Sequence, residues 1–494
     1  SDRKKKVNPF DWEAGFPNVF KQGKFDVVIG NPPYIQIQKL SSIYPEQTEY
    51  IKKYFETAKE RNFDLYVVFI ERGLKLLRKK GLLGYICPNR FFTSDYGKKV
   101  VDLIQNYNIY EIVNFRHYLV FENADTYTNL LFFSIEKQKD KIKYIEFQGL
   151  LKTNHLMANQ GLINEANCGF VKKDEISSEA IKKHPVYLMT GIDQSVFNKL
   201  NKSKFRFSDL YKENFQGLIT GNNDIYILKL IKKEKGYGDY YSKALLKNVK
   251  IENNSVLPIL SDSDINNYQA DDSGYYIIFP YDNTGKILVE KELSSKHPLA
   301  YKYLSIFRKD LMKRENNKFN DTYWYRYSRS QNTDKQKTSK LLIPHVVKKM
   351  RCAFDEKGNY AINNVGVNGI HLKEHLKISP YFIMAVLNSN VASFFISKIS
   401  IFHSGGYYAA NKQFASIIPF PSIDNKSEEH DEIVKCVTSL IQLKGCLPKA
   451  KLPEDRNSIE NNISALENEI NSKVYKLYGI TMRSEIETIE SNIK

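Results

Sequence analysis

The chain has 494 residues, 42% of them hydrophobic, which is enough for about three domains with buried cores at ~150 residues each. No stretch approaches the ~20 apolar residues of a membrane span, and no apolar segment follows the basic start of the chain as in a signal peptide. Five cysteines lie far apart, without a Cys-x-x-Cys pair or clustered histidines. We therefore expect reduced thiols in a cytoplasmic protein, with no metal site and no disulfide framework.

The formal charge of +17 comes from 73 Lys and Arg against 56 Asp and Glu. Such an excess favours a polyanionic partner, because phosphate contacts release counterions, although a merely soluble basic protein can have the same balance. The densest mixture of rings and cations is residues 323–329, Tyr-Trp-Tyr-Arg-Tyr-Ser-Arg. This stretch fits a nucleic-acid surface with stacking rings, and it fits an edge strand that packs its rings inside equally well.

Residues 1–24 are polar and are expected to form an irregular lead-in, after which Phe25 to Gly30 predict a strand that runs into Asn31-Pro32-Pro33-Tyr34. Two prolines fix φ and lack N–H donors, and each disfavours a helical conformation in the residue before it. We therefore expect a stiff, extended loop that presents the Asn31 amide, a free carbonyl and the Tyr34 ring. An ordinary proline turn is the less favoured alternative.

Strands and helices alternate from residue 25 to about 150. Helical spacing predicts a helix over 63–80 with Asp64 as N-cap, ended by Gly81, and a buried strand follows it. The remaining expected elements are a helix near 95–106 and strands near 111–115, 127–136 and 142–148. This order predicts a parallel α/β sheet with a terminal antiparallel pair, a partial Rossmann-like fold. Ligands of such sheets bind beyond the carboxyl ends of the strands, where Asn31 and Tyr34 lie.

The hydrophobic pattern and the composition of the sequence change after residue 150. Residues 151–425 have shorter periodic runs and many Asn, Lys and Tyr, which predicts a separate α+β domain. Residues 426–494 predict a helical tail that breaks between Gly445 and Pro453. Its apolar stripe consists of Ile459, Ile463, Leu466, Ile470, Val474 and Leu477. A helical hairpin packed on its own domain is the preferred interpretation, and a partner-binding coiled coil is the alternative.

The proline-stiffened loop suits methyl transfer to an exocyclic amine. The lone pair of adenine N6 is delocalised into the ring, and two acceptors outside the ring plane would localise it. The side-chain oxygen of Asn31 and the carbonyl of Pro32 are two such acceptors, and Tyr34 can stack on a base that has left the duplex. Transfer from a sulfonium donor then depends on positioning and electrostatics, without a metal or a strong general base.

On these residues the chain resembles the Eco57I/TaqI-like N6-adenine DNA methyltransferases, which often occur as fused type IIG restriction-modification enzymes of bacteria. Asn31-Pro32-Pro33-Tyr34 matches the catalytic motif of that family, and residues 64–88 resemble the helix and strand that follow it. The resemblance implies that Asn31, Pro32, Pro33 and Tyr34 are catalytic. It also implies that Phe121 is a second aromatic residue against the flipped adenine, although a lone Phe before a turn is usually a core residue.

The resemblance continues into the second half of the chain. Segments similar to the target-recognition domain and tail of the family are Phe215 to Asn223, Tyr381 to Ser389, Lys412 to Pro421 and Val474 to Gly479. It implies double-stranded DNA as partner, read by polar side chains in a groove. The candidate DNA-binding residues are Arg326, Arg329, Gln331, Asn411, Lys412 and Gln413, each of which could instead be solvated or contact phosphate.

The family binds S-adenosylmethionine through a Gly-rich turn after the first strand of its sheet, and we find no counterpart. Only 30 residues precede Asn31, and the glycines of 220–223, 366–369 and 405–406 do not follow a strand and open a helix as required. No nuclease core of Asp and Glu-x-Lys is evident either. We expect a fragment, or a chain completed by a second subunit, that alone neither binds the methyl donor well nor methylates DNA.

The leading hypothesis is an adenine-specific DNA methyltransferase region joined to a sequence-reading domain. The alternative is a DNA-binding specificity module in which the half-sheet is only a scaffold. A third class, N-methylation of RNA or protein, uses similar Asn-Pro-Pro-aromatic loops, but the large basic C-terminal region argues against it.

Overall fold

The structure is a computed structural model that describes residues 10–60, 62–116, 118, 120–121, 126–147, 171–364, 366–403, 405–422 and 427–493. The chain divides into two compact units, Ser1–Gln194 and Ser195–Lys494. Each unit has its own sheets and its own hydrophobic cores. The two units are therefore described separately.

The first unit is built on a six-stranded sheet with the order β1-β2-β4-β3-β5-β6. The strands are β1 (Phe25–Gly30), β2 (Leu77–Pro88), β3 (Asn108–Asn114), β4 (Thr128–Ser134), β5 (Lys141–Phe147) and β6 (Val171–Ser177). β1 and β2 are parallel, as are β3 and β5, whereas β4 is antiparallel to both of its neighbours. The sequence predicted a terminal antiparallel pair within residues 25–150. The antiparallel pair at the end of the sheet is instead β5 with β6, which lies beyond residue 150, and the antiparallel β4 lies in the middle of the sheet.

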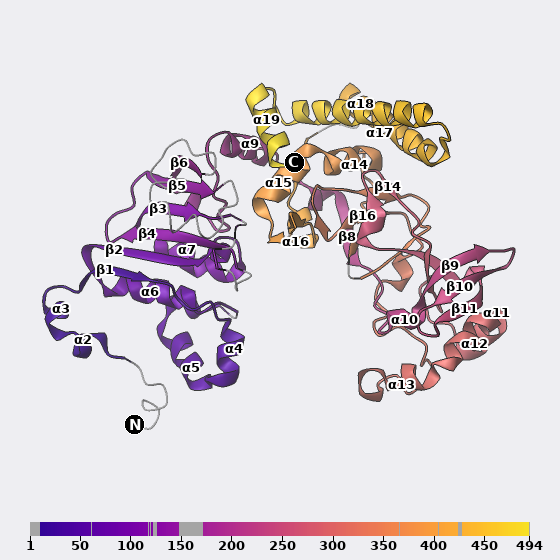
Figure 1. The fold of residues 1–494 in the computed structure, drawn as a ribbon, viewed down its shortest axis with the longest axis horizontal. Helices are drawn as coiled ribbons and strands as arrows, with labels where there is room; N and C mark the ends of the chain where they lie inside the picture. The colour runs from indigo at the N-terminus through magenta and orange to yellow at the C-terminus, as the bar shows by residue number, and fades with distance from the viewer. Residues whose placement is uncertain are drawn as a thin grey trace. The chain divides into compact units, whose positions relative to one another are not determined.

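Helices cover one face of this sheet. α6 (Tyr66–Leu76) and α7 (Lys98–Ile104) pack on it together and bury a core that includes Val67, Ile70 and Val101 (Figure 1). α4 (Ile37–Ile43) and α5 (Pro45–Tyr54) follow the Asn-Pro-Pro-Tyr loop.

The helix expected over 63–80 is shorter at both ends, because Leu77 already pairs with Phe25 of β1. Gly81 therefore lies inside β2 and does not end a helix. The prediction that Asp64 is the N-cap is wrong: Leu65 occupies that position, and the Asp64 carboxylate instead accepts a hydrogen bond from the hydroxyl of Tyr96 at 3.2 Å.

The segment before β1 is more ordered than its polar composition predicted. It forms two short helices, α2 (Trp12–Gly15) and α3 (Pro17–Lys21). Phe16, Phe20 and Trp12 meet the ring of Phe25 edge to face, with centroids 5.5–6.1 Å apart. Aromatic contacts of this geometry stabilise by about 0.5–1.5 kcal/mol each, so they hold the segment against the start of β1.

The second unit contains two larger sheets, with the orders β11-β10-β9-β15-β12-β19 and β18-β16-β20-β8. Their strands are β8 (Tyr211–Gln216), β9 (Ile227–Lys233), β10 (Tyr237–Ser242), β11 (Lys247–Glu252), β12 (Val256–Leu260), β15 (Tyr275–Ile278), β16 (Lys340–Pro344), β18 (Ala353–Asp355), β19 (Ala361–Ile362) and β20 (Val367–Leu372). Two-residue and three-residue strands complete the unit: β7 (Phe205–Arg206), β13 (Ile265–Asn266), β14 (Gln269–Ala270), β17 (Val346–Val347), β21 (Phe402–His403), β22 (Tyr407–Ala409) and β23 (Pro419–Phe420).

Helices surround these sheets. Those before the C-terminal tail are α9 (Gly191–Asn201), α10 (Asn223–Tyr226), α11 (Glu290–Lys296), α12 (Pro298–Ile306), α13 (Arg308–Asn317), α14 (Pro380–Asn388), α15 (Asn390–Ile399) and α16 (Lys412–Ala415). Within the described residues no single helix has the length and apolar composition of a membrane span; α14 and α15 reach them only together, as a pair bent by 58°.

The C-terminal tail is helical, as predicted. α17 (Glu428–Cys446) and α18 (Pro453–Leu477) form the expected hairpin, and α19 (Arg483–Asn492) follows (Figure 1). Ile463, Ile470 and Val474 of the apolar stripe are buried, and α14 packs against α17. The hairpin therefore stabilises its own unit.

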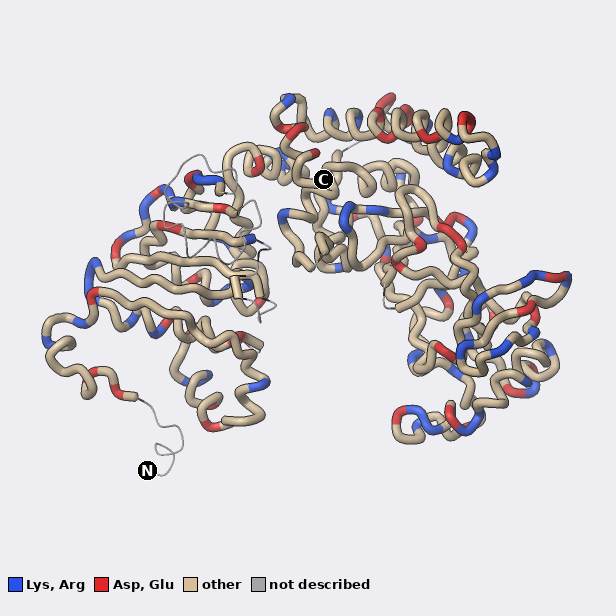
Figure 2. Tube along the Cα trace, viewed as in Figure 1, with Lys and Arg blue, Asp and Glu red and all other residues tan. Residues whose placement is uncertain are grey.

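The aromatic stretch 323–329 belongs to the core. Trp324, Tyr325 and Tyr327 are fully buried, and the hydroxyl of Tyr327 donates to the carbonyl of Ile278 at 2.6 Å. The nucleic-acid interpretation of these three rings is therefore wrong, because they are inaccessible for stacking. Basic and acidic residues are interspersed along both units (Figure 2).

Candidate functional site

The Asn-Pro-Pro-Tyr loop leaves the sheet at the carboxyl end of β1, as predicted. Asn31 is exposed, whereas Pro32 is buried and Pro33 and Tyr34 are half-buried. Within the part of the chain that the structure describes, neither the Asn31 side chain nor the Pro32 carbonyl has a hydrogen-bond partner. The stiff backbone thus fixes the Pro32 carbonyl and places the Asn31 side chain beside it in the chain, so that two acceptors lie at one strand end.

The ring of Tyr34 is held in a defined position. Its hydroxyl donates to the carbonyl of Ile86 on β2 at 3.1 Å. Burial raises the pKa of the Tyr34 phenol well above its ordinary value, so the ring is neutral at physiological pH. Its centroid lies 6.3 Å from that of Tyr66 and 6.5 Å from that of Phe121, both edge to face. The structure therefore brings Phe121 beside Tyr34.

A second layer of side chains supports this corner. The hydroxyls of Tyr66 and Tyr96 are 2.9 Å apart, which links α6 to the loop before α7. On the same helix the carboxylate of Glu71 is fully buried and accepts from the backbone N–H and the hydroxyl of Thr57, both at 2.9 Å. Lys75 neutralises it. These contacts hold α6 in place, and with it the ring of Tyr66 that meets Tyr34 edge to face.

In the second unit, four of the six candidate DNA-binding residues meet in one place. Gln331, Asn411, Lys412 and Gln413 line a cleft of about 600 Å³. We call it the amide cleft; it is lined by Glu213, Asn214, Phe215, Gln216, Gln331, Asn332, Lys335, His345, Asn368, Asn411, Lys412 and Gln413. Asn411 also caps α16, because its side chain accepts from the N–H of Gln413 at 3.1 Å.

The other two candidates, Arg326 and Arg329, lie outside the amide cleft. The guanidinium of Arg326 pairs with Asp321 at 2.6 Å and lies over the ring of Phe319. Arg329 pairs with Glu315, also at 2.6 Å. Each charge is neutralised by an acidic residue nearby in the sequence.

Lys335, one of the two lysines that line the amide cleft, is paired with a carboxylate, and Lys412 is the other lysine. The carboxylate of Glu213 accepts from Lys335 at 2.5 Å and contacts Nδ1 of His371 at 2.8 Å. Burial acts to raise the pKa of Glu213, but these hydrogen bonds outweigh it and hold the pKa below its ordinary value. The cleft therefore offers mainly neutral amide groups.

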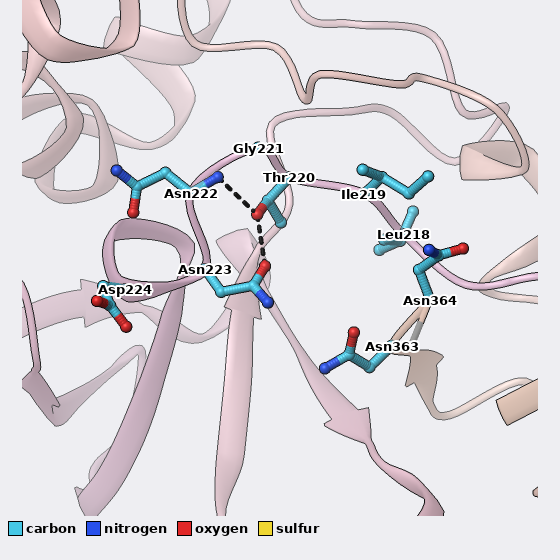
Figure 3. Close-up of a pocket in the computed structure, with 9 residues that line it drawn as sticks. All are labelled: Leu218, Ile219, Thr220, Gly221, Asn222, Asn223, Asp224, Asn363 and Asn364. Carbon is cyan, nitrogen blue, oxygen red and sulfur yellow. Dashed lines mark hydrogen bonds between the residues drawn. The ribbon is translucent and has the colours of Figure 1, made fainter. Parts of the chain in front are cut away.

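A second pocket of about 400 Å³ lies in the same unit (Figure 3). The loop 218–224 and the pair Asn363 and Asn364 line it. The Thr220 hydroxyl donates to Oδ1 of Asn223 at 2.6 Å and accepts from the Asn222 N–H at 3.1 Å. The loop turns at Gly221 with φ +80°, where a side chain would meet Ser328.

The three glycine segments considered as cofactor-binding turns are 220–223, 366–369 and 405–406. Within the described residues none of them joins the end of a strand to the start of a long helix. The loop 220–223 opens only the four-residue α10. Gly366 and Gly369 lie before and within β20, and Gly405 and Gly406 lie between β21 and β22.

Sequence reasoning missed Asn214, Asn368 and His345 of the amide cleft. Asn368 lies in β20 between Ile343 of β16 and Gln216 of β8. Only the alternation of polar residues at 214 and 216 signals a polar sheet face, and it names no function.

Comparison with known proteins identifies both parts of the chain. Residues 1–121 match the Eco57I restriction-modification methylase family, and residues 257–420 match the TaqI-like C-terminal specificity domain. The restriction enzyme and methyltransferase RM.Eco57I of Escherichia coli is 24% identical over 99% of the chain, which covers 49% of that protein. The methyltransferase M.BstVI of Geobacillus stearothermophilus is 25% identical over 83% of the chain and 69% of its own length.

Among solved structures, the type IIL restriction-modification enzyme MmeI in complex with DNA has a similar fold, with a TM-score of 0.56 at 10% identity. The match covers 94% of the chain and 56% of MmeI. The chain thus spans about half the length of RM.Eco57I and of MmeI. It carries Eco57I-type methylase sequence and a TaqI-like C-terminal specificity domain, and its homologues are type II restriction-modification methyltransferases.

Proposed function

We propose that the chain is the base-gripping and DNA-reading part of an adenine-N6 DNA methyltransferase of a restriction-modification system. The observation that carries the proposal is the corner at the end of β1. There the Asn31 amide and the Pro32 carbonyl, which have no hydrogen-bond partner within the described residues, belong to the same loop as Tyr34, whose ring meets that of Phe121 edge to face. Adenine needs such an arrangement of two acceptors for its amino group and an aromatic surface for its ring.

The proposed chemistry follows from these groups. The target adenine leaves the duplex, at the expense of a few kcal/mol, and its N6 donates to Oδ1 of Asn31 and to the Pro32 carbonyl. Both acceptors favour a pyramidal nitrogen with a localised lone pair. Tyr34 is neutral and fixed by Ile86, so it can stack on the base without repelling it. S-adenosylmethionine, when bound by the complete protein, supplies the methyl group.

We further propose that a segment outside this chain, or a second subunit, completes the cofactor site. The glycine segments of the described residues do not fit a cofactor turn. β1 is an edge strand among the described residues, and it exposes 56% of Val27 and 84% of Ile29. Unpaired edges with exposed apolar side chains favour further pairing, so β1 is the expected junction.

Two measurements test these proposals. Digestion of DNA methylated by the complete protein, followed by mass spectrometry of nucleosides, should detect 6-methyladenine. Methylcytosine instead would contradict adenine as the substrate, and sequence-specific binding without methylation would favour a recognition module. Calorimetry of the isolated chain with S-adenosylmethionine should detect no saturable binding, and micromolar affinity would refute the second proposal.

A further inference from the structure

We infer that His345 and Asn368 form a base-reading pair in the amide cleft, which presents one N–H donor to a hydrogen-bond acceptor on a base edge of double-stranded DNA. The inference rests on the proposed function. It assigns part of the DNA sequence specificity to two residues that are not among the six candidates named from the sequence. It is carried by the burial and the unused hydrogen-bonding capacity of Asn368.

The pair has a defined geometry. Nε2 of His345 lies 3.0 Å from Oδ1 of Asn368. Since an amide oxygen only accepts, Nε2 carries the proton and donates it. Burial lowers the pKa of His345, so the ring is neutral and its contact with Asn368 is a hydrogen bond between uncharged groups. The contact fixes the orientation of the amide, with its NH₂ group directed away from His345.

This NH₂ group has no acceptor. Asn368 is only 2% exposed, and its Nδ2 lacks a hydrogen-bond partner in the described part of the chain. Nδ2 of Asn214, on the neighbouring β8, is buried and unpartnered as well. Each unsatisfied buried donor costs about 1–3 kcal/mol, and such groups are rare in folded proteins. Two of them lining one cleft indicate that a ligand supplies acceptors there.

The chemistry of the cleft favours a base edge over a phosphate. A phosphate site needs uncompensated cations, but Lys335 is already paired with Glu213, which leaves Lys412 as the other lysine of the cleft. A single amide N–H₂ is suited to an uncharged acceptor. In the major groove these acceptors are N7 and O6 of guanine, N7 of adenine and O4 of thymine.

The test is selection of binding sites from a randomised duplex library by the full chain, followed by sequencing. The wild-type protein should enrich a sequence with an acceptor-bearing base at the position that Asn368 reads. The substitution Asn368→Asp replaces the donor with an acceptor. It should reverse the preference at that one position towards cytosine, whose major-groove edge offers an amino donor and no acceptor, by roughly 5- to 150-fold in relative affinity.

His345 is a positioning residue, and its variants separate positioning from folding. His345→Ala frees the amide and should relax the preference at the same position, while His345→Gln retains a donor and should restore it. Asn248→Asp is the matched control, since this exposed strand residue lies outside the cleft and should leave every preference unchanged. Thermal unfolding of each variant shows that the protein remains folded.

The outcomes distinguish the inference from the function on which it rests. A wild-type chain that enriches no sequence contradicts the DNA-reading function, and the base-reading pair fails with it. A wild-type consensus that Asn368→Asp leaves unchanged at every position overturns the inference alone. Equal behaviour of His345→Ala and His345→Gln removes the positioning role of His345.

Discussion

Replacing Gly221 with Ala should destabilise the second unit through two separable effects. With φ at +80°, any other residue enters the left-handed region at a cost of about 1–2 kcal/mol. An added Cβ would also lie 1.8 Å from Oγ and 2.8 Å from Cβ of Ser328, and overpacking of this kind costs about 1–3 kcal/mol. We therefore expect a total loss of about 2–5 kcal/mol in the free energy of unfolding.

The assay is urea denaturation followed by tryptophan fluorescence, with Trp12 replaced by Phe so that the buried Trp324 reports on the second unit alone. Ser328→Gly removes both atoms of Ser328 and leaves only the approach of 3.2 Å to Nη1 of Arg314, so Gly221→Ala in that background should cost mainly the backbone part, about 1–2 kcal/mol. Equal losses in the two backgrounds would refute the steric argument, and no loss in either would refute the whole account of the loop.

Three further predictions concern buried or half-buried groups. Lys340→Met should lower the free energy of unfolding, measured by urea denaturation, by about 3–5 kcal/mol. The substitution leaves the buried carboxylate of Asp355, which lies 2.8 Å from the ammonium group, without its counterion. Adding Asp355→Leu should recover part of this loss, and no recovery would contradict the pairing. Burial acts to raise the pKa of Glu71, but its hydrogen bonds lower the pKa overall. The ionised Glu71 therefore stabilises the fold above its ordinary pKa of 4.5, and this contribution is lost as the pH falls through the pKa of the folded state. The difference in unfolding free energy between wild type and Glu71→Gln should narrow in that pH range, and a difference that widens in acid would contradict the lowered pKa. Tyr34→Phe should lower the free energy of unfolding by about 1 kcal/mol in thermal unfolding, because the hydrogen bond to Ile86 is lost. The complete protein with this substitution should still transfer the methyl group. Abolished transfer would show that the hydroxyl, not the ring, is needed.

Local sequence features predicted the extended loop at the end of β1. The two prolines after an apolar strand define a stiff corner, and the backbone constraints that they impose act within a few residues. The position of Phe121 beside Tyr34 followed only from the resemblance to a family, since 87 residues separate the two in the chain. Helix ends were less predictable, because the strand pairing of Leu77 with Phe25 overrides the helical pattern that continues past it.

The second unit shows why the proposed recognition residues are hard to find in a sequence. Arg326 looked available, but Asp321 neutralises it, and a ring-rich stretch that could have stacked on bases is core. His345 and Asn368 are 23 residues apart and form no motif. The antiparallel pairing of β16 with β20 brings them together, and such long-range pairing leaves no local signal.

The role of Asn31 is tested most directly by the rate of 6-methyladenine formation in the complete protein carrying Asn31→Ala. Asn31 is exposed and has no partner in the described residues, so the unfolding free energy should change by less than about 0.5 kcal/mol. Asn18→Ala, at another exposed asparagine of the same unit, serves as the matched control. We predict that the rate falls about 10²- to 10³-fold, as for the loss of one preorganised hydrogen-bonding group, with duplex binding unchanged. A rate within a few-fold of wild type would contradict the account.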